Sequence, residues 1–187
     1  SDETYIKKNK IKSKLINDAN MMENSLKLNL YSSDFSIDIE TTAYENLVKS
    51  KSDRYEFIFP KIDLVKKIDN KTSLNGNFLF KSSNLIRNYN TNIFEKSNVN
   101  DLIFTSYPKI TGMGFYNNYE FVIKNSNSHG KKTKNFKDGE NLYVSSLLQL
   151  NSSLPLVNEN ENYKNILKPK LSFKVAPNHT KDYKSDE

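Results

Sequence analysis

Paired carboxylates are the first feature of this sequence that resembles a catalytic arrangement. Asp38 and Glu40 alternate with apolar residues, so both would lie on one face of a β-strand with their side chains about 7 Å apart. That separation falls in the range used by glycoside hydrolases, which work through two carboxyl groups. Two polar residues on a hydrated strand face explain the same pattern, and we favour that interpretation. Asp53-Arg54-Tyr55-Glu56 is likewise interpreted as a charged cluster at a strand end.

Metal ligands and nucleophiles are scarce in the sequence. Cysteine is absent, which excludes disulfides, thiolate metal sites and cysteine nucleophiles. His129 and His179 are fifty residues apart and neither has a spaced partner, so we expect no zinc site. Four serines, Ser145, Ser146, Ser152 and Ser153, lie outside any Gly-x-Ser-x-Gly motif. We therefore expect no catalytic residue, no metal and no cofactor, and hence a protein that is not an enzyme.

Basic residues are densest in one polar segment that contains Lys131, Lys132, Lys134 and Lys137. An exposed, solvated loop accounts for this cluster, and a specific anion site is the alternative. The chain has 28 Lys and Arg against 22 Asp and Glu, a net charge of +6, but only Arg54 and Arg87 are arginines. Because arginine is the usual reader of phosphates and base edges, we do not expect nucleic acid as a partner.

The elements that carry these residues alternate in polarity with a period of two, as strands do. Of the 187 residues 36% are hydrophobic, the mean hydropathy is −0.73, and 12% are aromatic, a combination typical of ordered β structure. We expect strands near 3–13, 24–31, 34–46, 54–65, 73–82, 86–97, 101–110, 115–125, 141–152 and 166–176. A helical turn within 11–24 is the main helical signal.

Two prolines mark positions where a strand ladder would be imperfect. Around Pro60 the apolar residues switch from odd to even positions, and such a parity switch requires a bulge or a break. Pro169 keeps the parity of its expected strand but cannot donate a backbone hydrogen bond. Both are candidate strand-weakening positions.

The predicted fold is all-β: an antiparallel meander of about ten long strands, with residues 1–187 forming a single segment. A transmembrane barrel wall is favoured because the strands are long enough to cross a bilayer at a tilt, and because Tyr and Phe often fall near strand ends. The remaining candidates are another outer-membrane porin or receptor barrel, and a soluble β-sandwich or solenoid that binds carbohydrate.

The connections predict a topology for such a wall. Short turns at 83–85 and 111–114 would lie on the periplasmic side, with 66–72, 98–100 and 126–140 outside. In the expected strand 166–176, Leu171, Phe173 and their apolar neighbours would face lipid. The opposite face carries Lys168, Lys170 and Lys174, which would form lumen-facing contacts for anions.

Several short motifs resemble a known family. They are Asp2-Glu3-Thr4-Tyr5-Ile6, Tyr44-Glu45-Asn46-Leu47, Asp53-Arg54-Tyr55-Glu56-Phe57-Ile58-Phe59-Pro60, Ser153-Leu154-Pro155-Leu156 and Leu167-Lys168-Pro169-Lys170-Leu171. Taken in this order, they resemble the C-terminal barrel region of the lipopolysaccharide-assembly outer-membrane protein family, LptD, also called the organic solvent tolerance family.

The resemblance implies a location, a function and partners. LptD-like proteins form a large barrel in the outer membrane, in contact with its lipid, and insert lipopolysaccharide into the outer leaflet. An LptE-type lipoprotein plugs the barrel, and an LptA-type periplasmic bridge delivers lipopolysaccharide to a jellyroll domain. The present chain is expected to be a fragment of the barrel wall, because it is short for such a barrel and shows no jellyroll. The cysteines that join jellyroll and barrel in well-studied members have no counterpart here.

Overall fold

The computed structural model describes residues 20–50, 53–70, 74–90, 92–160 and 162–177. These residues form β-strands and connections, with no helix among them. A membrane-spanning helix is accordingly not found in the described part of the chain. The strand expected at 3–13 and His179 lie outside the described residues. A helical turn was expected within 11–24. Of these residues the structure describes 20–24, and from Met21 onward they form a strand.

Eleven strands occur in the described residues. Seven are long: β1 (Met21–Tyr31), β2 (Phe35–Asn46), β3 (Tyr55–Ile68), β4 (Gly76–Tyr89), β5 (Ile93–Ser106), β7 (Tyr116–Lys131) and β8 (Gly139–Ser153). Four are short: β6 (Lys109–Ile110), β9 (Leu156–Asn160), β10 (Tyr163–Leu167) and β11 (Lys170–Val175).

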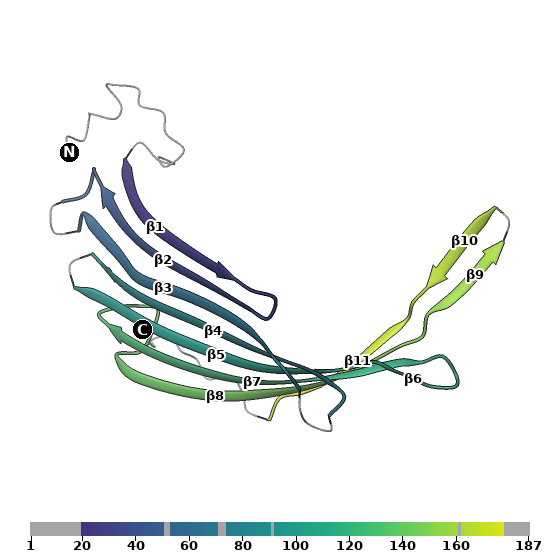
Figure 1. Cartoon of the computed structure of the whole chain (residues 1–187). Coiled ribbons are helices and arrows are strands. Elements are labelled where there is room, and N and C mark those ends of the chain that lie inside the picture. Colours follow the sequence, from purple (N-terminus) through teal and green to yellow (C-terminus); the bar gives the residue numbers. More distant parts are fainter. Residues whose placement is uncertain (1–19, 51–52, 71–73, 91, 161, 178–187) are drawn as a thin grey trace.

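The strands form one curved antiparallel meander (Figure 1). The order is β1-β2-β3-β4-β5-β7-β8-β11, with β6 paired to β7, and β9 and β10 form a separate hairpin that projects from the sheet (Figure 1). The sheet is open, because β1 and β11 end its path without pairing to each other. The all-β class and the antiparallel meander predicted from the sequence are therefore confirmed.

The number and limits of the strands differ from the prediction. Residues 83–85 and 98–100 are not turns but lie within β4 and β5, which pair with each other over their whole length. The expected strand 166–176 is divided at Lys168 and Pro169, which lie between β10 and β11. The expectation of about ten long strands is therefore wrong for the described residues, which contain seven long and four short strands.

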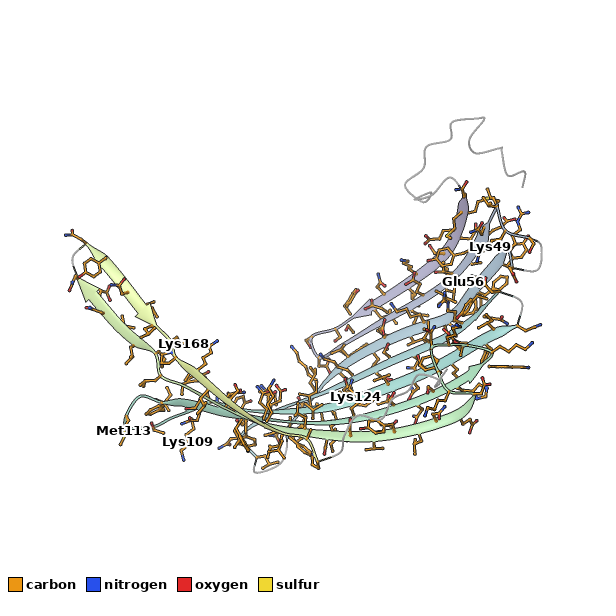
Figure 2. All side chains as sticks on the ribbon, turned by 180° about the vertical axis from the view of Figure 1, so that it is seen from behind. Lys49, Glu56, Lys109, Met113, Lys124 and Lys168 are labelled. Carbon is orange, nitrogen blue, oxygen red and sulfur yellow. The ribbon has the colours of Figure 1, made fainter. Side chains whose placement is uncertain are left out.

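The sheet has two ends, which we name by the features they carry. At the hairpin rim, β1 connects to β2, β3 to β4, and β5 to β7, and the β9–β10 hairpin projects there. At the Glu95 rim, β2 connects to β3, β4 to β5, and β7 to β8. Figure 2 shows Lys109, Met113 and Lys168 at the hairpin rim, and Lys49 and Glu56 at the Glu95 rim. Residues 111–114 and the β3–β4 connection thus share a rim, which contradicts their predicted placement on opposite sides.

A two-residue bulge interrupts β3. The register of β3 against β2 shifts between Glu40 and Thr42 of β2. The register of β3 against β4 shifts between Ile58 and Lys61 of β3. Phe59 and Pro60 therefore stand opposite single residues of both neighbours. The bulge lies where the parity of the apolar residues switches. It keeps Phe57 and Leu64 on the same face of the sheet, because Phe57 pairs with Ala43 and Leu64 with Ile37.

Very little of the described chain is buried, because the main sheet is a single layer. The buried hydrophobic side chains among the described residues are Leu47, Phe104 and Tyr143. A sheet normally buries one face against a second layer. The larger part of the apolar side chains in this sheet has no protein layer over it.

Candidate functional site

One face of the sheet, which we call the apolar face, collects the hydrophobic residues of successive strands. The cross-strand pairs place Leu28 opposite Ile39, and Ile39 opposite Ile62. Further along the sheet, Phe121 stands opposite Leu148, which stands opposite Val175. Residues in register share a face, so the eight strands β1, β2, β3, β4, β5, β7, β8 and β11 contribute to one continuous surface.

Exposure of large hydrophobic side chains is concentrated on this face. Leu26 is 71% exposed at one edge of the sheet and Phe173 is 62% exposed at the other. Further exposed members are Leu28, Leu30, Phe35, Tyr55, Phe57, Tyr119, Phe121, Ile123, Leu142, Val144, Leu148, Leu150, Leu171 and Val175. A continuous exposed apolar surface of this kind marks contact with lipid or with another protein.

The most apolar band of this face crosses the strands obliquely. The register line through Leu28 of β1 reaches Asn84 of β4 and Asn127 of β7. On β4, however, the aromatic residues of the face are Phe78 and Phe80, and on β7 they are centred on Phe121, closer to the hairpin rim in each case. Barrel strands are tilted and staggered relative to the membrane plane, so a lipid-facing band would cross them in this oblique way.

The opposite, polar face carries cross-strand ion pairs. Lys27 Nζ lies 2.9 Å from Glu40 Oε1, and Lys124 Nζ lies 3.1 Å from Asp101 Oδ1. The two faces therefore differ in character: one carries partly exposed ion pairs and the other carries exposed hydrophobic residues. Exposed ion pairs contribute little stability and indicate contact with water.

Asp38 and Glu40, the pair considered for acid–base chemistry, lie on the polar face and have separate partners. Tyr31 donates a hydrogen bond of 2.7 Å to Asp38, and Glu40 is paired with Lys27. Each carboxylate thus has its own structural partner on a neighbouring strand. This arrangement agrees with the interpretation as hydrated polar residues.

The three lysines predicted as lumen-facing anion contacts occupy different elements. Lys170 and Lys174 lie in β11 opposite Ser153 and Gln149 of β8, on the polar face. Lys168 precedes that strand, and its Nζ stands 6.0 Å from the centre of the Tyr116 ring. Lys168 and Lys170 together line a groove of about 350 Å³, whereas Lys174 does not line it. The three therefore do not form one continuous ladder.

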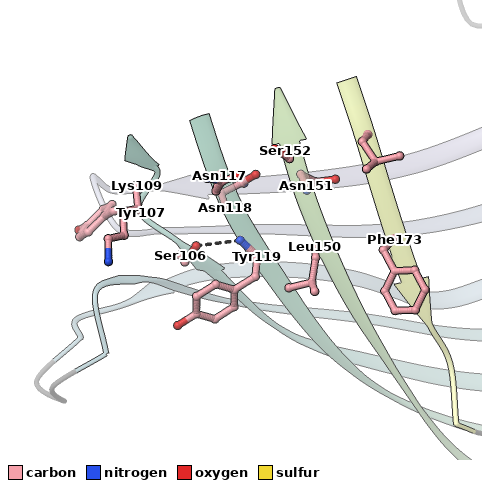
Figure 3. Close-up of a pocket in the computed structure, with 11 residues that line it drawn as sticks. Ser106, Tyr107, Lys109, Asn117, Asn118, Tyr119, Leu150, Asn151, Ser152 and Phe173 are labelled. Atoms are coloured by element: carbon pink, nitrogen blue, oxygen red, sulfur yellow. Dashed lines mark hydrogen bonds between the residues drawn. The ribbon is translucent and has the colours of Figure 1, made fainter. Parts of the chain in front are cut away.

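A second groove lies on the apolar face near the hairpin rim (Figure 3). It measures about 410 Å³, and its apolar wall includes Tyr119, Leu150 and Phe173. Ser106 accepts a hydrogen bond of 2.9 Å from the backbone N–H of Tyr119 at its edge (Figure 3). Lys109 lines the same groove, so an apolar wall adjoins a cationic side chain at this rim.

The segment with four lysines lies at the Glu95 rim. Lys131 ends β7, and Lys132, Lys134 and Lys137 follow in the connection to β8, with all four side chains exposed. The fold of this connection is organised by Glu95 of β5, which is 3% exposed. Glu95 Oε1 accepts hydrogen bonds from Tyr89 at 2.9 Å, from Asn135 at 2.7 Å and from the Thr133 hydroxyl.

Pro60 and Pro169, the candidate strand-weakening positions, differ in setting. Pro60 belongs to the bulge of β3, within the sheet. Pro169 lies just before β11, and its carbonyl accepts a hydrogen bond of 3.1 Å from the backbone N–H of Leu154. The weakening itself stays a prediction for both.

An amide cluster on the apolar face was not predicted from the sequence. It consists of Ser82, Asn84, Asn98, Asn100, Asn125 and Asn127 on β4, β5 and β7, joined by side-chain hydrogen bonds. It lies on the Glu95-rim side of the apolar band. The alternation within each strand indicates which residues share a face. The contacts between strands depend on their register, which the local sequence does not specify.

Metal-ligating side chains are not grouped in the described part of the chain: no set of three or more that could hold an ion occurs there. His129 lies on the apolar face opposite Glu140, with its ring 5.8 Å from that of Phe94.

Comparisons with known proteins add no family assignment. No family model matches the chain. No curated protein matches it either.

Proposed function

We propose that this chain is part of the wall of an outer-membrane β-barrel of the LptD type, which assembles lipopolysaccharide and inserts it into the outer leaflet. The observation that carries the proposal is the single-layer sheet with an exposed apolar face and a polar face. In such a wall the apolar face meets lipid and the polar face lines a hydrated lumen.

The oblique course of the apolar band supports a membrane wall over a soluble sheet that is exposed on both sides. Strand lengths support it as well, since β3, β4 and β5 have 14 residues each and a tilted crossing needs about 9–11. Aromatic side chains lie near both rims, including Tyr119 toward the hairpin rim and Tyr55 at the Glu95 rim. Aromatic residues are enriched where a membrane meets water.

The lipopolysaccharide part of the proposal is supported by the motif resemblance and by the basic groove on the polar face. Lipopolysaccharide carries phosphates and acidic sugars, and Lys168 and Lys170 line one groove with polar neighbours. An LptE-type plug inside the barrel, and an LptA-type bridge that delivers lipopolysaccharide to a jellyroll domain, would complete the assembly.

Spin-label accessibility tests the wall directly. The chain has no cysteine, so Leu148→Cys and Gln149→Cys each give one label, on the apolar and the polar face of β8. In lipid vesicles we expect the label at 148 to be accessible to oxygen dissolved in the bilayer and the label at 149 to a water-soluble relaxant. A chain that is monomeric and folded without detergent or lipid contradicts the proposal and favours a soluble β protein.

Photo-crosslinking tests the lipopolysaccharide role within the barrel. A photoreactive residue at position 170 should capture lipopolysaccharide in cells that are transporting it, and one at position 27, also on the polar face but far across the sheet, serves as the matched comparison. A barrel that inserts but yields no lipopolysaccharide adduct from any polar-face position favours a different outer-membrane barrel, such as a porin or receptor.

A further inference from the structure

The amide cluster is a polar patch within the strands of the apolar face. Ser82 donates to Asn100 at 2.8 Å, Asn127 donates to Asn98 at 3.2 Å, and Asn127 also donates to Asn125 at 2.8 Å. Amides in contact with hydrocarbon would be costly even when paired. In a membrane wall the hydrogen bonds within the cluster limit this cost, and its Asn98 and Asn127 end, toward the Glu95 rim, lies nearest to the lipid headgroups.

A groove of about 660 Å³ adjoins this cluster toward the Glu95 rim. Asn98 and Asn127 of the cluster line it, together with Phe94, Lys96, His129, Glu140 and Leu142. The lining therefore combines two apolar side chains, Phe94 on β5 and Leu142 on β8, with the amides and charged groups of these strands and of β7 between them. Binding sites for small polar molecules combine an apolar surface with a few fixed polar groups in this way.

Two polar atoms at this groove have unused hydrogen-bonding capacity. Within the described residues, Asn127 Oδ1 and His129 Nδ1 are shielded from solvent and have no hydrogen-bond partner. Shielded polar atoms are normally paired, so unpaired ones require an explanation. Both side chains line the same groove.

We propose that this groove binds the saccharide headgroup of a glycolipid at the membrane surface. Amide side chains both donate and accept hydrogen bonds, as sugar hydroxyls do, which suits them to hydroxyl-rich ligands. The aromatic ring of Phe94 and the exposed side chain of Leu142 offer apolar contacts to the C–H faces of a sugar. Lys96, which also lines the groove, supplies a positive charge for a phosphate or acidic substituent of the same headgroup. The inference rests on the proposed membrane wall, because it places the groove at headgroup level.

The test uses saturation-transfer NMR on the full chain in detergent micelles. The probe is the water-soluble core oligosaccharide released from lipopolysaccharide by mild acid, in phosphorylated and enzymatically dephosphorylated forms. We expect signal from sugar ring protons with both forms. Replacing Asn98 and Asn127 by leucine should weaken binding about tenfold, the loss expected when one or two hydrogen bonds are removed.

A matched control and a second variant keep the test decisive. Asn165→Leu removes an exposed amide of β10, remote from the groove, and should leave binding unchanged. Leu142→Trp fills the groove from a position that is 75% exposed and should weaken binding without removing a hydrogen bond. Binding that is equal in all variants overturns the proposal. Binding that is lost on dephosphorylation also overturns it, since the groove would then be an anion site.

These results are separable from those for the membrane wall. A chain that inserts into vesicles, with the labels at 148 and 149 oriented as expected, but does not bind the oligosaccharide retains the wall and loses the saccharide site. A chain that is folded and monomeric in water loses the proposed wall, whatever it binds.

Discussion

Asn135 donates a hydrogen bond of 2.7 Å to Glu95, which ties the β7–β8 connection to the polar face of β5. The same carboxylate oxygen accepts from Tyr89 and Thr133, and Arg87 lies 3.6 Å from the other oxygen. One nearly inaccessible side chain thus holds together three elements at this rim. Thr133 and Asn135 thus fix the basic segment to Glu95, while the lysines of the segment stay exposed.

Replacing Glu95 by alanine should release the β7–β8 connection. The variant removes the acceptor of three hydrogen bonds, and we expect local opening to become easier by about 2 kcal/mol. Trypsin cleavage after Lys132 should then accelerate about 30-fold, because cleavage follows the population of the open form. Glu120→Ala, on the polar face of β7, is the control and should leave the rate unchanged. Equal cleavage of the two variants would show that Glu95 does not hold this connection.

Gly76, the first residue of β4, is expected to tolerate no side chain. A Cβ there would lie 2.5 Å from Cζ of Phe104 and 2.5 Å from the carbonyl oxygen of Thr105. Gly76→Ala should therefore lower the free energy of unfolding by about 1–3 kcal/mol, the usual effect of overpacking. Urea titration monitored by circular dichroism in detergent measures it.

Gly112→Ala is the matched control for that substitution. No atom lies within 4 Å of a Cβ at this position, in the β5–β7 connection. The unfolding free energy should change by less than about 0.5 kcal/mol. A similar loss in both variants would mean that packing against Phe104 is not the cause.

A lysine on the apolar face should impair insertion. Leu148 stands between Phe121 and Val175, so Leu148→Lys places a charge in the apolar band. The expected cost is about 2–4 kcal/mol if the position lies near the bilayer midplane. Refolding into lipid vesicles against urea measures it. Gln149→Lys on the polar face beside Glu120 should have little effect, and the reverse order of the two costs would invert the assigned faces.

Period-two alternation predicted the fold class because each strand exposes its two faces to different surroundings. Its main failure concerns β4 and β5. The segments 83–85 and 98–100 were expected to be connections, because Ser and Asn are common in turns. In the structure Asn98 donates to Asn84 from the neighbouring strand, so partners far along the chain satisfy residues that the local sequence assigns to loops.

The candidate sites were predictable to different degrees for the same reason. Lys170 and Lys174 share a face through alternation alone, and the structure places them so. Their separation from Lys168 arises because the strand is interrupted at Pro169. The partners of Glu95 lie 38 and 40 residues away in the sequence, at Thr133 and Asn135. Contacts of that range depend on strand register, which a single sequence does not specify.

The bulge at Pro60 provides a test of how register is set. Deleting Pro60 leaves Phe59 alone opposite Thr41 of β2 and Ile86 of β4, which makes both ladders regular. We expect the shortened chain to fold, with a free energy of unfolding within about 1 kcal/mol of the parent, because all the remaining strand residues stay on the same face of the sheet.

The same deletion tests whether Pro60 weakens the sheet. A regular ladder should slow amide hydrogen exchange at Thr41 and Ile86, since each would face a single residue of β3 in place of two. Deleting Ser83 from the regular middle of β4 is the control. The pairing there contains no bulge that could absorb the deletion, so the side chains in one half of β4 would move to the opposite face of the sheet. This deletion should prevent folding. If the Pro60 deletion also failed to fold, the bulge would be required for the shape of the sheet. If it folded with exchange at Thr41 and Ile86 unchanged, Pro60 would not be a weak point.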